Sequence, residues 1–319
     1  QLVNPPPPYP ILGLMVYGVW LTYLIAAKKN LVMRNPSQLN RLWLCWPISL
    51  GSYLVSQYSL TNLDTTIGAG RDLSDPLHSI IFALPIAGFG LLLMSEFVTW
   101  LFATLGPQRA FAPLRHPVMS VHATTLLYYV FEPGTETCLM FDAFSRPLHP
   151  LRYVMWTISV SSMCLALYLV VEAVLEASRD PRSLSHSQLR GMLVDALLGC
   201  YGTFVLGFLG SRLRIDGAGT WPNYAFFCAA SACFYLMLHR LCGMLGHVIR
   251  NRRIVQLGTS QQFMAIRVAV IGVWHIFPLV WLLGATHLVS AFNEHVGYVV
   301  CDLCAKYLLL FVYLSHVNA

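Results

Sequence analysis

The sequence predicts an all-α integral membrane protein, and two observations carry this prediction. Of its 319 residues, 56% are hydrophobic and only 11% are charged, whereas roughly a quarter of the residues in a soluble domain carry charge. Apolar segments close to 20 residues long recur along the chain, and this is the length that a helix needs to cross a hydrocarbon core of ~30 Å. Lipid offers no hydrogen-bond partners to open backbone, so these segments should be helices.

The apolar segments follow one another with short connections. In chain order they are approximately 10–27, 42–60, 77–104, 117–131, 149–175, 190–210, 222–248, 264–289 and 296–317. The fourth is short, with Pro117 and Glu132 at its limits. The longest connection on the side that carries fewer basic residues is 132–148, where Pro133 and Gly134 indicate turns. Such short connections leave no room for a soluble catalytic domain within this chain, so we expect its function to reside among the helices.

The distribution of basic residues predicts the orientation in the membrane. Alternate connections contain most of the Lys and Arg residues, among them Lys28, Arg115, Arg190 and Arg253. Because cytoplasmic loops are enriched in Lys and Arg, we expect an extracellular N-terminus and a cytoplasmic C-terminus. The net charge of +6 is spread over several loops, so it reflects topology and does not indicate a nucleic-acid site.

The cysteines do not predict a disulfide framework or a metal site. The chain has nine, and most lie in apolar segments, where cysteine is usually a small buried hydrophobe. Cys301 and Cys304 form a C-x-x-C pair, but no second pair stands at the spacing that a four-ligand zinc site needs.

The last segment contains the stretch "DLCAKYLLLF", in which Asp302 and Lys306 stand four residues apart. Lys306 is about ten residues from either end, roughly 15 Å of helix, which is too far for its side chain to reach the membrane surface. Asp302 lies on the same helix face and can neutralise it. Two interpretations are open: a structural ion pair, or a lysine that forms a Schiff base with a carbonyl cofactor and has Asp302 as counterion.

Two aromatic patterns bear on this choice. In "LRYVMW", Arg152 and Trp156 share a helix face, and in "VWHIFPLVWLLGA", Trp274 and Trp281 lie seven residues apart with Pro278 between them, where it should kink the helix. Aromatic residues at helical spacing are commonly plain core packing. Together with "DLCAK" they become far more specific.

With these motifs the chain resembles the microbial (type I) rhodopsins over about residues 77–317. "DLCAK" is similar to their seventh-helix D-x-x-x-K, "RYVMW" to their third-helix R-Y-x-[DE]-W, and "WHIFPLVW" to their sixth-helix W-x-x-Y-P-x-x-W. The resemblance implies a seven-helix retinal-binding domain over 76–319, preceded by an N-terminal extension, 1–75, with two additional transmembrane helices.

The resemblance also implies a set of retinal-binding residues. Lys306 would bear all-trans retinal, with Asp302 as the main counterion; Trp156 and Trp274 would sandwich the polyene, and Arg152 would lie on the extracellular side. The remaining expected pocket residues are Phe277, Pro278 and Trp281 of the sixth helix, Phe227, Ser231 and Phe234 of the fifth, and Cys200, Gly202 and Thr203 of the fourth.

The chain departs from this family at the positions that serve proton pumping. Met155 stands where pumps carry the carboxylate that accepts the Schiff-base proton, and Ala166 stands where they carry the proton donor. A pump needs an acceptor and a donor of matched pKa, so proton pumping is not expected. The third-helix motifs of chloride and sodium pumps are also absent, since the three positions are Met155, Ser159 and Ala166.

The loss of one carboxylate leaves two spectral outcomes open. A single counterion holds the Schiff-base proton less firmly than two. If Asp302 suffices, absorption should shift to the red; if it does not, the pigment should be deprotonated and absorb in the near ultraviolet. A separate hypothesis is that Ser159, one turn from Met155, binds the Schiff-base proton through water or a halide.

Two functions remain compatible with these departures. The extra N-terminal segments resemble those of enzyme-linked rhodopsins, which favours a light sensor, itself not an enzyme, that signals to a C-terminal cytoplasmic output domain. The alternative is a light-gated ion channel, although Val160 and Leu197 do not form the Cys–Asp pair of algal channelrhodopsins. The expected partners are retinal, the lipid bilayer, a second copy of the chain and the output domain.

Three further polar residues lie in or near the apolar segments. Glu96 and Asp195 are expected to pair with nearby arginines at helix ends, and His275, next to Trp274, is expected to be a packing histidine.

Overall fold

The computed structural model describes residues 83–94, 112–131, 140–178, 184–212, 219–256 and 260–317, together with the isolated positions 48, 51 and 54. The described chain is almost entirely helical, as predicted. The predicted N-terminal segments 10–27 and 42–60 lie outside these residues apart from the isolated positions. The third predicted segment is described as the helix Ala83–Met94.

The remaining long helices match the predicted apolar segments, with ends that differ by a few residues. They are α5 (Ala112–Phe131), α6 (Pro150–Ser178), α7 (His186–Arg212), α8 (Trp221–Ile249), α10 (Ser260–Ala285) and α11 (Ala291–Val317). The short helix α9 (Arg252–Gln256) follows α8. Within the described residues, α6, α7, α8 and α10 are each long and apolar enough to cross a membrane. The predicted segment 264–289 was expected to continue to residue 289, but the corresponding helix, α10, ends at Ala285. In the turn that follows, His287 adopts a positive φ of 57°.

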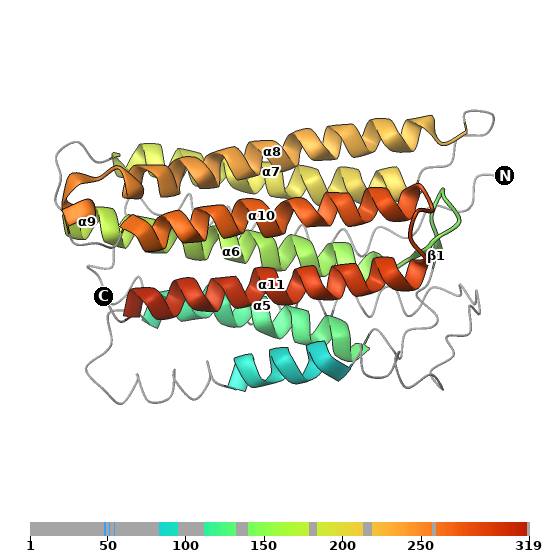
Figure 1. The fold of residues 1–319 in the computed structure, drawn as a ribbon, viewed down its shortest axis with the longest axis horizontal. Helices are drawn as coiled ribbons and strands as arrows, with labels where there is room; N and C mark the ends of the chain where they lie inside the picture. Colours follow the sequence, from blue (N-terminus) through green and yellow to red (C-terminus); the bar gives the residue numbers. More distant parts are fainter. Residues whose placement is uncertain are drawn as a thin grey trace.

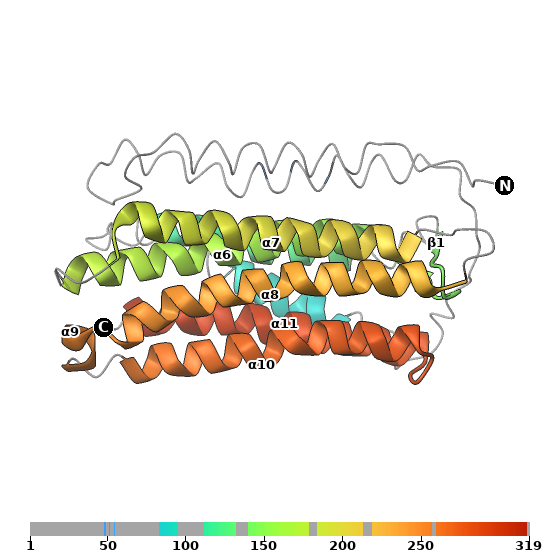
Figure 2. The ribbon, with the colours of Figure 1, turned by 90° about the horizontal axis from the view of Figure 1, so that it is seen from above.

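The helices form an elongated bundle, seen from two directions in Figures 1 and 2. Contacts run in a closed ring from α5 through α6, α7, α8, α10 and α11 back to α5. In α6, 83% of the most apolar stretch is buried, against 28% in α7 and in α10. Helix α6 is therefore the central helix of the bundle, and α7 and α10 expose broad apolar faces, as expected for lipid contact.

The α7–α8 interface depends on residues without side chains. A Cβ atom at Gly199 would lie 2.6 Å from the backbone oxygen of Cys233, and one at Gly202 would lie 2.6 Å from the Cys233 sulfur. Both distances are too short for real atoms, so the two helices approach this closely only because both positions are glycine. Gly202, which the resemblance placed near retinal, thus has a packing contact with α8.

A small hairpin caps one end of the bundle. Strands β1 (Met140–Phe141) and β2 (Pro147–Leu148) pair antiparallel, with Met140 opposite Leu148. The backbone N–H of Ala143 donates to the carbonyl of Ser211 at the end of α7. In Figure 1 the hairpin lies at the same end as the α10–α11 turn, opposite α9 and the end of α11.

Candidate functional site

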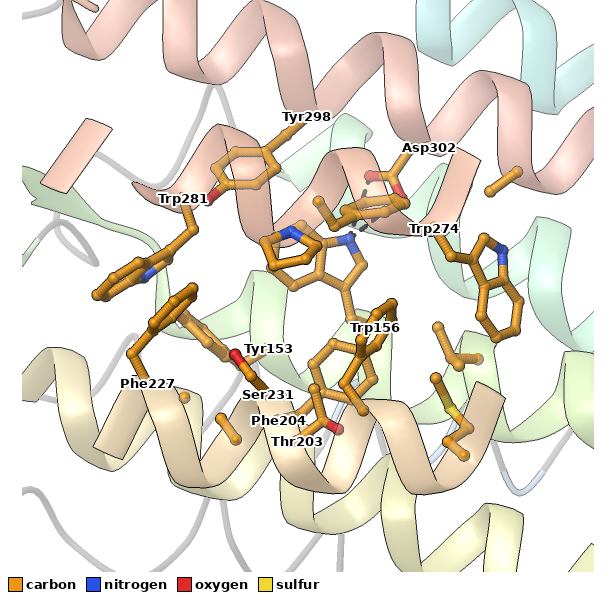
Figure 3. Close-up of a pocket in the computed structure, with 18 of the residues that line it drawn as sticks. Tyr153, Trp156, Thr203, Phe204, Phe227, Ser231, Trp274, Trp281, Tyr298 and Asp302 are labelled. Atoms are coloured by element: carbon orange, nitrogen blue, oxygen red, sulfur yellow. Dashed lines mark hydrogen bonds between the residues drawn. The ribbon is translucent and has the colours of Figure 1, made fainter. Parts of the chain in front are cut away.

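An almost wholly apolar cavity of about 110 Å³ lies inside the bundle. Residues from α6, α7, α8, α10 and α11 line it, and Asp302 and Lys306 are the charged residues among them. Figure 3 shows that Trp281 and Phe227 lie at one end of this cavity and Trp274 at the other, with Trp156 between them. The cavity is therefore long and aromatic.

Lys306 and Asp302 form a buried ion pair. The side chains are 2% and 1% exposed, and the Lys306 Nζ lies 2.5 Å from Asp302 Oδ1. Two further donors reach the same carboxylate: the Tyr129 hydroxyl at 2.8 Å from Oδ2 and the Trp156 indole N–H at 3.1 Å from Oδ1. Donors from α5 and α6, in addition to Lys306 of its own helix, therefore converge on the Asp302 carboxylate.

The sulfur of Met155 occupies the other side of the Lys306 ammonium. The Lys306 Nζ lies 3.4 Å from this sulfur, and the hydroxyl oxygens of Thr125 and Ser159 lie 3.8 and 3.7 Å from it. The Thr125 hydroxyl donates to the backbone carbonyl of Val121 at 2.7 Å. A thioether is only a weak hydrogen-bond acceptor. On this side the Lys306 ammonium therefore faces an uncharged group that accepts hydrogen bonds only weakly.

Aromatic rings shape the cavity wall. Trp281 and Phe227 stack with ring centroids 4.5 Å apart, while Phe277 and Tyr298 meet Trp156 edge-on at 5.5 and 5.0 Å. Offset and edge-on packing of this kind holds rings in fixed positions. The wall is therefore aromatic and suited to a flat, apolar ligand.

A second, smaller and more polar cavity adjoins the first on the side of the hairpin, and Arg152, Arg146 and Glu294 line it. Arg152 donates to the Tyr128 hydroxyl at 3.0 Å and lies 2.8 Å from Nδ1 of His295. Arg152 is therefore not among the residues that line the apolar cavity, and instead connects α6 to α5 and to the start of α11.

Arg146 ties the hairpin to α11. Its guanidinium contacts Asp142 at 2.7 Å and Glu294 at 2.8 Å, and it donates to the backbone carbonyl of Trp281. Glu294 lies in the first turn of α11, ahead of the apolar stretch. Burial raises the pKa of the Glu294 carboxyl, and the charge of Arg146 opposes that shift. Burial would lower the pKa of Arg146, but Glu294 and Asp142 outweigh it and hold that pKa above its ordinary value.

The structure places most of the residues predicted for the site around the apolar cavity. Those that line it are Lys306, Asp302, Trp156, Trp274, Phe277, Pro278, Trp281, Phe227, Ser231, Phe234 and Thr203. Met155 and Ser159 are not among the lining residues: the sulfur of Met155 contacts the Lys306 ammonium, and the Ser159 hydroxyl contacts that sulfur. Cys200 is fully buried but is not among the described residues of the lining.

Sequence reasoning missed several residues of the site. Tyr129, Thr125 and Phe89 contact Asp302, Met155 and Lys306 respectively. Tyr298 stands four residues before Asp302, so its place on the same helix face was a signal that could have identified it.

The lesser predictions for polar residues are confirmed where the structure describes them. Asp195 pairs with Arg240 at 2.8 Å. The Nδ1 of His275 lies 2.6 Å from the carbonyl of Ile271 on its own helix, and its ring packs edge-on against Phe234 at 5.6 Å. Glu96 lies outside the described residues.

The residues present fit a retinal chromophore. An aldehyde that condenses with a lysine needs an apolar, elongated cavity with the amine in its wall, and a protonated nitrogen there needs a buried anion. Lys306, Asp302 and the aromatic wall supply these features together. A merely structural ion pair would have no need of the cavity.

Comparison with known proteins agrees with the resemblance. A family model described as "Bacteriorhodopsin-like protein" matches residues 76–318. A comparison with curated proteins finds no match.

Solved structures share the fold at low sequence identity. The transmembrane domain of the Salpingoeca rosetta rhodopsin phosphodiesterase is 15% identical, with a TM-score of 0.58 over 97% of this chain and 95% of that one. Thermophilic rhodopsin from Rubrobacter xylanophilus is 18% identical, with a TM-score of 0.58 over 74% and 95%. The light-driven proton pump of Coccomyxa subellipsoidea is 13% identical, with a TM-score of 0.57 over 75% and 96%. The predicted rhodopsin fold is thereby confirmed.

Proposed function

The chain belongs to the bacteriorhodopsin-like family, and on that premise we propose that it is a light sensor that carries all-trans retinal on Lys306. The observation that carries the proposal is a buried lysine in the wall of an apolar aromatic cavity, paired with Asp302. This position suits a Schiff-base lysine, because an amine there is shielded from water and from competing reactions.

Retinal would supply an aldehyde that condenses with the Lys306 amine, with loss of one water, and a polyene that isomerises in light. The residues of the chain hold and balance that linkage. Asp302 supplies the negative charge beside the nitrogen, and Tyr129 and Trp156 keep that charge in place. Trp156, Trp274 and Trp281 confine the polyene, so that movement is transmitted to α6 and α10.

The chain does not fit a proton pump. Met155 contacts the Lys306 nitrogen at 3.4 Å but a thioether cannot accept and store a proton. Ala166 is a buried apolar residue and cannot supply one. Transport by the usual relay would need titratable groups at both positions.

Signalling to an output domain is the function that we propose in place of pumping. The match to the rhodopsin phosphodiesterase covers 97% of this chain, whereas the matches to two other rhodopsins cover 74% and 75%. The similarity to a transmembrane domain of an enzyme fusion thus extends beyond the bundle itself. We propose accordingly that residues 1–75 form an N-terminal extension with two transmembrane helices before the bundle of 76–319.

The same proposal includes the orientation and the assembly of the chain. The extracellular N-terminus and cytoplasmic C-terminus inferred from the basic residues would direct the end of α11 toward a cytoplasmic partner. A homo-oligomer would bring two such partners together.

The experiment that tests the proposal is the absorption spectrum of the purified chain expressed with all-trans retinal. The parent chain should show a retinal band, and Lys306→Ala should show none while inserting normally into membranes. Cys304→Ala, on the exposed side of the same helix, should retain the band. A band in Lys306→Ala would contradict the assignment, and sustained light-gated currents in cells would favour the alternative, an ion channel.

A further inference from the structure

His122 of α5 is a buried histidine that the proposed function leaves without a role. The residue is 0% exposed, and neither ring nitrogen has a hydrogen-bond partner among the described residues. Buried polar atoms in native proteins almost always have a partner. An imidazole with two unpaired nitrogens in the core therefore calls for a functional explanation.

The imidazole lies close to Lys306. His122 interacts with both the charge and the backbone of Lys306, although the backbone contact lacks the geometry of a hydrogen bond. Both side chains also pack around Phe89, whose ring centroid lies 5.7 Å from the Lys306 Nζ and 6.4 Å from the centroid of the His122 ring. The two titratable groups thus share Phe89 as a neighbour.

His122 lies on a different side of Lys306 from the counterion. On α5, Tyr129 reaches Asp302, whereas His122 stands seven residues earlier, about 10 Å along the helix, and lies beside Lys306. Going from Tyr129 back to His122 on α5 thus corresponds to going from Asp302 forward to Lys306 on α11, so the two helices run antiparallel here. His122 therefore flanks Lys306 on the side away from Asp302 and Arg152.

We propose that His122 accepts the proton that the Lys306 nitrogen releases in light, the task that Met155 cannot perform. This inference depends on the proposed retinal linkage at Lys306. Rotation at the end of the Lys306 side chain moves its N–H bond from the side of Asp302 toward His122. The proton passes to an imidazole nitrogen, directly or through one water, while the bonding electrons stay on the lysine nitrogen; the proton later returns by the same route.

The two candidate acceptors differ in the hydrogen bonds that they already make. Asp302 already receives hydrogen bonds from Tyr129, Trp156 and Lys306, so both of its oxygens are occupied. Neither nitrogen of the His122 imidazole has a hydrogen-bond partner among the described residues. When the proton moves to it, the core still holds one cation and one anion, so no additional charge has to be buried.

The test compares His122→Gln with His275→Gln, a control histidine on α10 whose Nδ1 contacts its own helix. A flash converts the visible band to a near-ultraviolet band when the Lys306 nitrogen loses its proton. In His122→Gln this conversion should be about a hundredfold slower, the range typical of a lost general base. In His275→Gln it should keep the parent rate.

Nitrogen NMR of ¹⁵N-histidine protein provides a readout that does not depend on the variant folding. In the retinal-free and dark forms of the parent chain, the signal assigned to His122 should be that of a neutral imidazole. Illumination should convert it to imidazolium on the time scale of the band change. An unchanged conversion rate in His122→Gln, a His122 signal that stays neutral, or a visible band that never loses its proton would overturn the inference. A parent chain without any retinal band would instead overturn the proposed function.

Discussion

At the scale of single residues, the site is organised around one carboxylate and one sulfur. Asp302 receives hydrogen bonds from Tyr129, Trp156 and Lys306. The sulfur of Met155 lies against the Lys306 ammonium and near the hydroxyls of Thr125 and Ser159. A carboxylate at position 155 would therefore stand beside the Lys306 nitrogen.

Met155→Asp should therefore strengthen the hold on the Lys306 proton. A second carboxylate near the nitrogen favours its protonated form, so the visible band should persist to higher pH and shift to the blue. The measurement is a pH titration of the absorption spectrum in the dark. Met155→Leu, which adds no charge, is the control and should titrate as the parent does. An identical spectrum in Met155→Asp would show that position 155 does not sense the chromophore.

The sequence predicted the part of this site that belongs to single helices. Asp302 and Lys306 share a face through their spacing of four, and Trp156 follows Arg152 at the same spacing. Tyr129 stands 173 residues from Asp302. No periodicity within α5 indicates that contact, because it arises only when helices distant in the chain pack together. For the same reason His122 could not be recognised before its neighbours were known.

At the scale of elements, helix positions were predictable and their contacts were not. Apolar length identifies α6 or α10 in the sequence, yet the hairpin β1–β2 has strands of two residues, too short to show the alternation that predicts a strand. The resemblance placed Cys200 and Gly202 beside retinal. In the structure Gly202 instead lets α7 approach Cys233 of α8, a packing role that residue identity alone did not reveal.

Gly199→Ala should destabilise the α7–α8 interface. The added Cβ would lie 2.6 Å from the Cys233 backbone oxygen, and backbone cannot move aside as a side chain can. Overpacking of this kind typically costs about 1–3 kcal/mol, which thermal unfolding in detergent should register as a lower Tm. Gly191→Ala is the control on the same helix, since a Cβ there meets nothing within 4 Å. Equal Tm values for the two variants would contradict the close approach.

Arg146→Gln should loosen the hairpin end of the bundle. Its removal leaves the buried carboxylates of Asp142 and Glu294 without their cation, and breaking a buried pair costs about 3–5 kcal/mol. The loss of stability relative to the parent should be largest at neutral pH and should shrink as the pH falls. Burial already raises the pKa of Glu294, and protonation of this carboxyl removes its unpaired charge. Thermal unfolding at pH 5 and pH 8 measures this difference.

The control for that experiment is Arg240→Gln. Arg240 pairs with Asp195, and these side chains are 37% and 40% exposed, so water can replace the lost partner. This variant should unfold close to the parent at both pH values. A deficit in Arg146→Gln that is the same at both pH values would mean that Glu294 does not carry the penalty.

At the scale of the whole molecule, the proposed sensor function predicts that light drives no net proton transport. Reconstituted vesicles should therefore show no light-driven pH change, because Met155 and Ala166 cannot pass a proton along the chain. The pump of Coccomyxa subellipsoidea, reconstituted in the same way, is the positive control. A pH change that a protonophore abolishes would contradict the proposed sensor.

The shared carboxylate of Asp302 has one further consequence. Its partners belong to α5, α6 and α11, so three helices are anchored to a single charge. Hydrogen bonds to an ionised acceptor are roughly twice as strong as those to a neutral one. A change in the charge of the Asp302 carboxylate would therefore weaken or strengthen all three hydrogen bonds together. Under the proposed function, loss of the proton from the Lys306 nitrogen would in this way change the packing of three helices.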